Sequence, residues 1–285
     1  MAKLTHHSYG KSGVRLTKVV RSGSRHQLFE INADIQLEGD FDAAYASGDN
    51  RQVIATDSIK NTVYVLAKQR PFYSVEQFSL ILARHFIATY PQVTQAEVEL
   101  TQASWQRIIV GGSPHDHAFT SAGPQLRYAK SMLDRHRNHP SLVGGVRDLL
   151  VLKTTSSEWR DFVDDGYRTL KDTRDRIMAT KVNADWAYNS LDGDFSAFAR
   201  AIDDAILTAF ATKHSLGVQQ TLKDMGDAAL AACNAIDSIA FTLPNLHRIP
   251  FNLEPFGLRF ENDIFVATDE PFGLIRGTIA REVIK

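Results

Sequence analysis

The sequence predicts an α+β protein in which helices pack on one face of antiparallel sheets. Apolar and polar residues alternate from Glu30 to Glu38, which is typical of a strand buried on one face. Apolar residues then follow helical spacing over residues 75–86, and alternation returns at residues 97–100. This order of elements recurs in the second half of the chain.

The first half supports the prediction element by element. Residues 14–16 are expected to pair with the alternating strand, and Gly23 lies between the two runs, where a turn is needed. Ser74 is the predicted N-cap of the helix, with Gln77 three residues further on. A further extended segment is expected over residues 115–126, so the order is strand, strand, helix, strand, strand.

The second half is expected to repeat this order. Its strand-like and helical segments lie at residues 146–153, 182–188, 198–210, 222–233, 236–243 and 272–279. A tandem duplication and a single α+β domain without internal symmetry explain this order equally well, because no repeat is visible in the residues themselves. If there are two domains, the boundary is expected near residues 138–145.

The counts exclude several classes of protein. The 285 residues carry 32 Lys and Arg against 33 Asp and Glu, a net charge of −1, which argues against a general nucleic-acid binder. Cys233 is the only cysteine, so neither an intrachain disulfide nor a cysteine-based metal centre is expected. Without a long apolar run, a signal peptide or a C-terminal Ser-Lys-Leu, we expect a soluble cytoplasmic protein. Common nucleotide and hydrolase motifs are also missing, and we expect no cofactor.

Several polar clusters interrupt the apolar pattern, and each has an ordinary structural explanation beside a functional one. Lys11, after Gly10, is a candidate base if burial lowers its pKa, although a solvated lysine is more common. Residues 55–58 are predicted to cap a helix rather than to act in catalysis, yet a helix start also attracts anions. Arg176, at the end of residues 173–176, suits a planar anionic ligand, although a surface ion pair is its usual role.

Two further clusters carry imidazoles. Asn245 and His247 are two residues apart, so on one strand both side chains would project to the same face and meet in one pocket. A buried histidine with a satisfied hydrogen bond is the commoner arrangement. His115 and His117, with His136 and His139 further along, match a metal-binding pattern only weakly because no spaced third ligand is identifiable, and we expect no metal.

Taken in order, these clusters resemble the uricase (urate oxidase) family. The shared strings span nearly the whole chain at family-like spacing, and residues 55–64, ATDSIKNTVY, are the most specific of them. The other strings are residues 9–11, 115–119, 151–155, 169–173, 175–177, 218–221 and 243–247.

The resemblance, which is strongest to the bacterial branch, implies two tandem T-fold (tunnelling-fold) domains, here residues 1–140 and 141–285. Each would hold an antiparallel four-stranded sheet with two helices. The resemblance also implies a homotetramer in which barrels stack around a tunnel and active sites lie at subunit interfaces. The implied reaction is cofactor-independent oxidation of urate by O2 to 5-hydroxyisourate and H2O2, with neither nucleic acid nor membrane as a partner.

The resemblance assigns roles to residues of this sequence. It implies a catalytic proton relay of Lys11, Thr56 and His247, and backbone contacts to the ligand at Asp57 and Val218. The full set of implied substrate-binding residues is Asp57, Trp159, Arg176, Val218, Gln219 and Asn245.

Side chains in that set have separate implied tasks. Arg176 and Gln219 would clamp one edge of urate, and Asn245, with Thr56, would hold dioxygen or water over the ring. Trp159 stands where the family has a stacking phenylalanine, and its indole still offers a π-face.

Two alternatives stay open on the sequence. A T-fold enzyme that acts on a pterin or purine ring would bind the ring through a buried glutamate, whereas this chain has Gln219. A catalytically inactive binding protein on the uricase scaffold is the other alternative, and Trp159 is the only feature that favours it.

Overall fold

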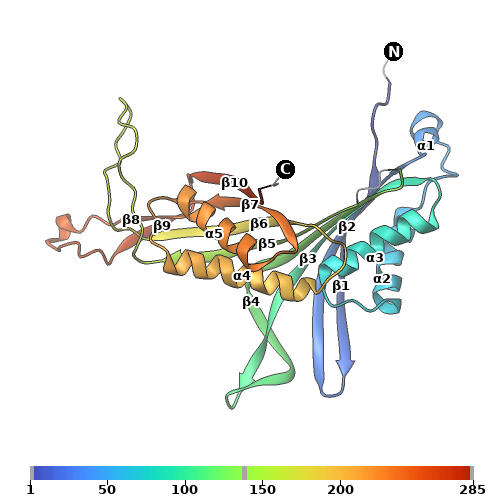
Figure 1. Ribbon diagram of the computed structural model, residues 1–285, viewed down its shortest axis with the longest axis horizontal. Helices are drawn as coiled ribbons and strands as arrows, with labels where there is room; N and C mark the ends of the chain where they lie inside the picture. Colours follow the sequence, from blue (N-terminus) through green and yellow to red (C-terminus); the bar gives the residue numbers. More distant parts are fainter. Residues whose placement is uncertain (1–2, 137–139, 283–285) are drawn as a thin grey trace. The chain divides into compact units, whose positions relative to one another are not determined.

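The computed structural model describes residues 3–136 and 140–282, and the chain divides into two compact units (Figure 1). Unit 1 consists of Met1–Gly145 with Ala187–Ala197, and unit 2 consists of Val146–Trp186 with Phe198–Lys285. A short segment of the second half therefore belongs with the first. The domain boundary between residues 140 and 141 stays a prediction.

The sheet of unit 1 confirms the predicted antiparallel strands. Its strands follow the order β1 (Tyr9–Ser22), β2 (Arg25–Gly39), β3 (Val93–Val110) and β4 (Ser113–Asp134), each antiparallel to its neighbour. The alternation in β2 places one set of side chains in the core, namely Ile31, Ala33, Ile35 and Leu37. Gly23 makes the turn between β1 and β2 with a φ of 62°, a value that favours glycine.

The described part of unit 1 has more helix than the sequence analysis predicted. α1 (Asp42–Ser47) was not predicted, and α2 (Thr56–Gln69) was recognised only by its start. α3 (Val75–Thr89) begins as predicted, because Ser74 Oγ accepts a hydrogen bond from Gln77 N at 3.2 Å. α2 packs against β1 and α3 against β3 and β4, which encloses the core of unit 1 (Figure 1).

Unit 2 has a similar order of elements. Its strands, of which β5 and β6 begin or end in unit 1, follow the order β5 (Ser141–Lys153), β6 (Met178–Tyr188), β7 (Ile236–Pro244) and β10 (Leu274–Ala280). The predicted apolar stripes form α4 (Phe195–Thr212) and α5 (Val218–Ala232), and α5 packs against β7 and β10. The sequence analysis missed three short elements, β8 (His247–Pro250), η1 (Glu254–Phe256) and β9 (Phe265–Thr268).

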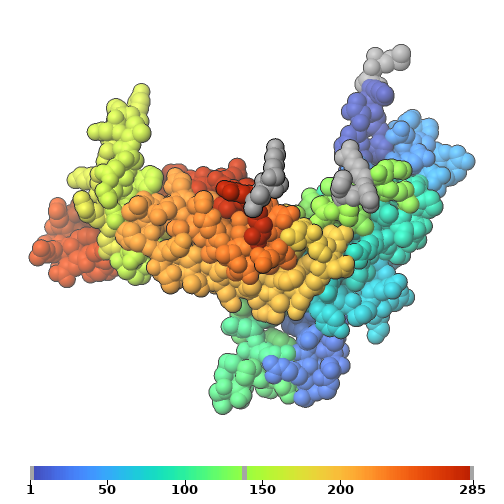
Figure 2. Space-filling view, in the orientation of Figure 1, coloured from blue at the N-terminus to red at the C-terminus, as the bar shows by residue number. Residues whose placement is uncertain are grey.

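The long loop of residues 154–177, between β5 and β6, stands out from the surface of unit 2 (Figure 2, yellow-green). Its outer part is solvated, since Val163 is 81% exposed and Tyr167 is 93% exposed. The two ends of this loop carry Trp159 and Arg176, so its base belongs to the candidate site. No helix in the described ranges is long and apolar enough to cross a membrane.

A lysine caps a helix in each unit. Lys18 Nζ on β1 donates to Ala67 O at 2.7 Å near the end of α2, and Lys153 Nζ on β5 donates to Lys213 O at 2.9 Å just after α4. Both ammonium groups satisfy carbonyls that a helix end leaves unpaired. Burial lowers the pKa of each lysine.

Arginines cap the last α-helix of each unit. Arg135 Nη2 donates to Tyr90 O at 3.0 Å after α3, and Arg281 Nη2 donates to Leu230 O at 2.6 Å and Cys233 O at 2.9 Å after α5. The two units therefore share side-chain roles as well as the order of their main elements. The spacing between equivalent residues varies with the intervening loops, which hides the repeat in the sequence.

Substituting the arginine that caps α5 tests this role. Arg281→Met should lower the free energy of unfolding by about 2 kcal/mol, because several carbonyls lose a charged donor at once. Chemical denaturation followed by circular dichroism measures the change. Arg276→Met, on β10, the strand that Arg281 directly follows, has an exposed side chain; it is the matched control and should change stability by less than about 0.5 kcal/mol. Equal losses in the two variants would contradict the capping role.

Candidate functional site

A pocket of about 640 Å³ in unit 2 gathers predicted site residues from three parts of the chain. They come from the loop before β6, the start of α5 and the β7–β8 junction. All six predicted residues of unit 2 line it, namely Trp159, Arg176, Val218, Gln219, Asn245 and His247. The structure therefore brings together residues as far apart in the sequence as Trp159 and His247.

Arg176 is one of the charged side chains that line the pocket, with Lys171, Asp172, Asp175 and Arg248. Its backbone N–H donates to Ser157 O at 2.9 Å, which ties the end of the loop to its beginning. Its Nε is buried and bonds to no other group in the described residues, and burial lowers the pKa of the guanidinium. A partly buried cation without an acidic partner favours an anionic or carbonyl-rich ligand, which would supply the missing acceptors.

Trp159 forms an aromatic wall of the pocket beside Arg176. Its backbone is fixed by two hydrogen bonds of 2.9 Å with Thr173, one in each direction. The indole stacks on Phe162, with ring centroids 5.5 Å apart and planes 15° apart, and the guanidinium carbon of Arg176 lies 5.7 Å from the indole centroid. A flat ring and a planar cation are thus held close together at the base of the loop.

The start of α5 adds backbone donors. Gly217 is the N-cap, and no side chain caps this helix, so Val218 and Gln219 are its first two residues with N–H groups that lack side-chain partners. Thr221 Oγ1 donates to Ser215 Oγ at 2.7 Å, and Ser215 Oγ donates to Gly217 O at 3.1 Å, which fixes the turn before the helix. Uncapped amides at a helix start suit a polar or anionic ligand edge.

Asn245 and His247 reach the pocket by a different route from the predicted one. The prediction that both project from a single strand is wrong, because β7 ends at Pro244 and β8 begins at His247. Asn245 N donates to Gly273 O at 2.8 Å, and this contact holds the junction in place. The amide and the imidazole nevertheless line the same pocket, as the sequence indicated.

The remaining predicted residues, Lys11, Thr56 and Asp57, belong to unit 1. Lys11 is half-buried on β1 beside a β-bulge, where Gly13 N donates to Asp34 Oδ1 at 2.7 Å. Gly10 is required there, because a Cβ would lie 1.7 Å from Ile35 O. The bulge and the close approach of the two strands fix the direction of the lysine side chain.

Thr56 and Asp57 open α2, but the predicted side-chain cap is wrong. The N-cap is Ala55, and no side chain accepts from the first-turn amides. The Asp57 carboxylate instead accepts from Lys60 Nζ at 2.5 Å and Asn61 Nδ2 at 2.9 Å. Lys60 is the main cause of its lowered pKa, with smaller contributions from Asn61 and from the charge of Lys11.

Two tyrosines of the resembling strings tie α2 to β1. Tyr9 Oη on β1 accepts from Ile54 N at 2.8 Å, and Tyr64 Oη on α2 donates to Arg15 O at 2.9 Å. These contacts set the distance between the lysine-bearing strand and Thr56. The sequence analysis singled out the strings but did not identify this positioning role.

Other predicted features have local explanations. His115 Nδ1 accepts from the backbone N–H of Ala118 at 3.1 Å, so this imidazole stabilises a turn in β4. His139 lies outside the described residues. Within the described ranges, no three His, Cys, Asp or Glu side chains are placed to hold a metal ion.

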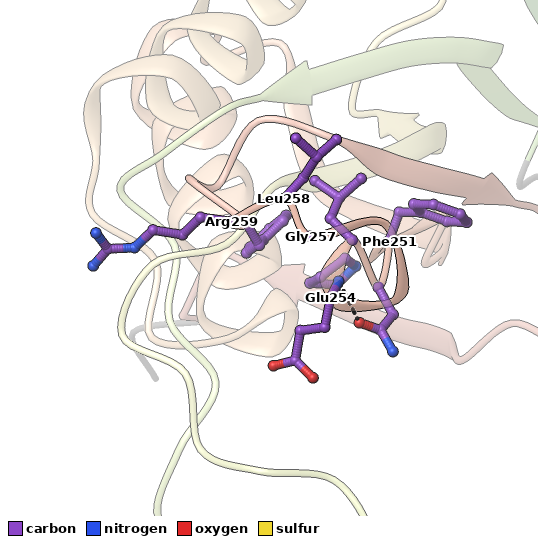
Figure 3. Close-up of a pocket in the computed structure, with 9 residues that line it drawn as sticks. Phe251, Glu254, Gly257, Leu258 and Arg259 are labelled. Carbon is purple, nitrogen blue, oxygen red and sulfur yellow. Dashed lines mark hydrogen bonds between the residues drawn. The ribbon is translucent and has the colours of Figure 1, made fainter.

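A larger and more open hollow of about 740 Å³ lies nearby in sequence, over residues 250–260 (Figure 3). One segment forms it, and the charged ends of Glu254 and Arg259 point in different directions (Figure 3). Asn252 Oδ1 accepts from Glu254 N at 3.1 Å, so its amide serves the turn. Without converging polar groups, this hollow is a poorer ligand site than the pocket around Arg176.

Some residues that position the site were not found from the sequence. Thr173 and Phe162 fix Trp159, and Gly217 lies against the indole. Thr173 belongs to the string of residues 169–173 and Gly217 lies directly before the string of residues 218–221, but neither string indicated a contact with Trp159. Thr173 and Phe162 act through contacts within an irregular loop, where no periodicity applies.

The fold and the site together define the class of protein. An aromatic wall, a guanidinium whose Nε has no hydrogen-bond partner among the described residues, an amide and uncapped helix-start amides converge in one pocket of an α+β protein, which is the lining expected of a binder of planar, carbonyl-rich rings. Comparison with known proteins gives the family. The uricase family model matches residues 7–131 and 142–276. The chain belongs to the uricase family.

Individual relatives agree over the whole length. The chain is 42% identical to a uricase of Arthrobacter globiformis over 98% of this chain and 90% of the relative. It is 34% identical to a uricase of Dictyostelium discoideum over 99% and 98% of the two chains. The crystal structure of the Arthrobacter globiformis uricase superposes with a TM-score of 0.93 at 41% identity, covering 100% of this chain and 97% of that one.

Proposed function

We propose that the chain oxidises urate with dioxygen through the residues gathered around Arg176 and those of β1 and α2. Membership of the family over the full chain makes it a urate oxidase, an oxidoreductase of purine metabolism. The observation that carries the proposal is the partly buried guanidinium without an acidic partner, beside an indole and uncapped amides. Urate is flat, anionic and rich in carbonyl groups, and it complements each of these features.

Binding is assigned to unit 2 with help from the start of α2. Arg176 and Gln219 hold a carbonyl and a ring nitrogen at one edge of urate, and Trp159 stacks on its face. The backbone N–H groups of Val218 and Asp57 contact the ligand at two helix starts, both of which lack a side-chain cap. Hydrogen bonds along the edge fix the ring in its plane.

Proton transfer is assigned to Lys11, Thr56 and His247. Lys11 takes a proton from urate through Thr56, assisted by His247, and the resulting dianion is electron-rich enough to reduce dioxygen directly. Asn245, with Thr56, holds dioxygen above the ring. A peroxide forms at the ring carbon and leaves as H2O2, taking back the proton held by the relay and one further proton from solvent, and water then adds at that carbon to give 5-hydroxyisourate.

The assembly proposed for the chain is a homotetramer with active sites at subunit interfaces. The assigned residues are divided between unit 1 and unit 2, and Thr56, Asp57 and Gln219 are exposed in the isolated chain. A partner subunit that covers them would exclude water from the reacting ring, which strengthens each polar contact to it. A cytoplasmic location is a further part of this proposal.

A spectrophotometric assay tests the function directly. Protein mixed with urate in air should bleach the near-ultraviolet absorbance of urate, consume oxygen and release H2O2 in equal molar amounts. Prior treatment with a chelator should leave the rate unchanged, and loss of activity on chelation would contradict the cofactor-independent mechanism.

Two further measurements on the wild-type protein distinguish the alternative functions. Binding of 8-azaxanthine without urate turnover would indicate an inactive binding protein, and turnover of a pterin in place of urate would indicate another ring-processing enzyme.

A further inference from the structure

Gly217 is buried directly against the wall of the pocket. A Cβ added to it would lie 3.0 Å from Cζ3 and 3.3 Å from Cε3 of the Trp159 indole, closer than ordinary van der Waals contact. Its φ is 171°, an extended value that any residue can adopt, so the backbone itself does not require glycine. Because Gly217 has no side chain, the Trp159 indole can lie this close to its backbone.

The indole has little freedom to move away. Both hydrogen bonds of its backbone with Thr173 are 2.9 Å long, and its face is stacked on Phe162. The six-membered ring of the indole therefore occupies the space beside Gly217 that a side chain would otherwise fill. A phenylalanine at position 159 would lack this second ring and would end short of the same contact.

The neighbouring ligand groups would respond to any shift. Gln219 Oε1 lies 3.4 Å from the hypothetical Cβ, and the Arg176 guanidinium carbon lies 5.7 Å from the indole centroid. A displaced indole would change the width of the slot in which a flat ring stacks. Small misplacements of this kind strongly weaken binding of a ring that stacks in the slot.

We propose that Gly217 is a positioning residue that makes room for the indole of Trp159 and so sets the slot in which the substrate ring stacks. The proposal deepens the function above, on which its substrate assignment rests. Gly217 contributes no side chain to the ligand and acts through Trp159. The two residues work as a pair, in which the large indole requires the smallest partner.

The experiment is a double-mutant cycle of Gly217→Ala and Trp159→Phe, measured in the full chain. Gly217→Ala should raise KM for urate and Kd for 8-azaxanthine by about tenfold, with kcat changed by less than about threefold, because the proton relay is untouched. In the Trp159→Phe background the same substitution should change KM and Kd by less than about twofold, because the clash is gone.

A matched control separates this effect from a general glycine effect. Gly166→Ala lies in the loop of unit 2, where a Cβ would meet no atom within 4 Å, and it should leave KM, Kd and melting temperature unchanged. An equal cost of Gly217→Ala in both backgrounds would overturn the proposal by assigning the effect to Gln219 or to the backbone. An unchanged KM and Kd in the single variant would overturn it as well.

The outcome does not depend on the proposed reaction. Wild-type protein that fails to oxidise urate contradicts the proposed function, whereas the ratios of Kd among the four variants test the Gly217–Trp159 pair by themselves. Crystal structures of the single and double variants with 8-azaxanthine should show the indole displaced only in Gly217→Ala.

Discussion

Replacing Lys11 with methionine should lower kcat for urate by about 10³-fold, since a positioned acid or base typically contributes 10²- to 10⁴-fold. Methionine keeps the length of the side chain and its fit beside the bulge of β1, but it carries no amine that can take a proton. KM should change by less than about threefold, because Lys11 is assigned to the proton and not to the urate edge. Steady-state oxygen consumption and urate absorbance measure both constants.

A second substitution separates the charge of Lys11 from its proton. Lys11→Arg keeps a cation near Asp57, whose pKa the Lys11 charge helps to lower, yet guanidinium cannot act as a base near neutral pH. Turnover should therefore remain within about tenfold of the methionine variant. Near-normal turnover of Lys11→Arg would contradict the relay and assign Lys11 an electrostatic role. Lys68→Met, an exposed lysine in the last turn of α2, should keep wild-type kcat.

The fold was predictable where the sequence has a strong period. The β2 alternation and the Ser74 cap of α3 follow from local spacing, and both are confirmed. Only the start of α2 was predicted, because the polar residues at the beginning of the string 55–64 indicated a helix cap and not the length of the helix. The β8–β9 pair depends on contacts within residues 247–268, which carry no period of their own.

The residues of the site were predictable mainly from the short sequence strings that resemble the uricase family. The geometry of the site was not predictable from them. The resemblance identified Arg176 and Trp159, but no local pattern places a residue of an irregular loop beside the start of α5. The spacing of Asn245 and His247 predicted that both side chains project from one strand. In the structure they line the pocket from the junction between β7 and β8, after Pro244. Ser157, which fixes the loop through a backbone hydrogen bond, has no signature in a single sequence. Thr173 ends the string of residues 169–173, but that string gave no indication of its hydrogen bonds with Trp159.

Replacing Arg176 with glutamine should lower kcat/KM for urate by about 10²- to 10³-fold, most of it through KM, because a desolvated charged hydrogen-bonding partner is worth about 2–5 kcal/mol. Glutamine can donate one hydrogen bond, but it provides neither the charge nor the planar fork of a guanidinium. Kd for 8-azaxanthine should rise in parallel. Arg174→Gln, two residues earlier in the same loop and exposed, is the matched control and should behave as wild type.

The free energy of unfolding should move in the opposite direction from activity. In the ligand-free chain the Arg176 Nε is buried without a partner, and burial disfavours the charge strongly enough to lower the pKa of the guanidinium. Removing that charge should leave the free energy of unfolding unchanged or raise it by up to about 1 kcal/mol. Loss of stability alongside loss of binding would contradict this, because it would mean that Arg176 holds the loop together and not the ligand. A more stable protein that no longer binds the ring would show that the chain keeps an uncompensated cation for its substrate.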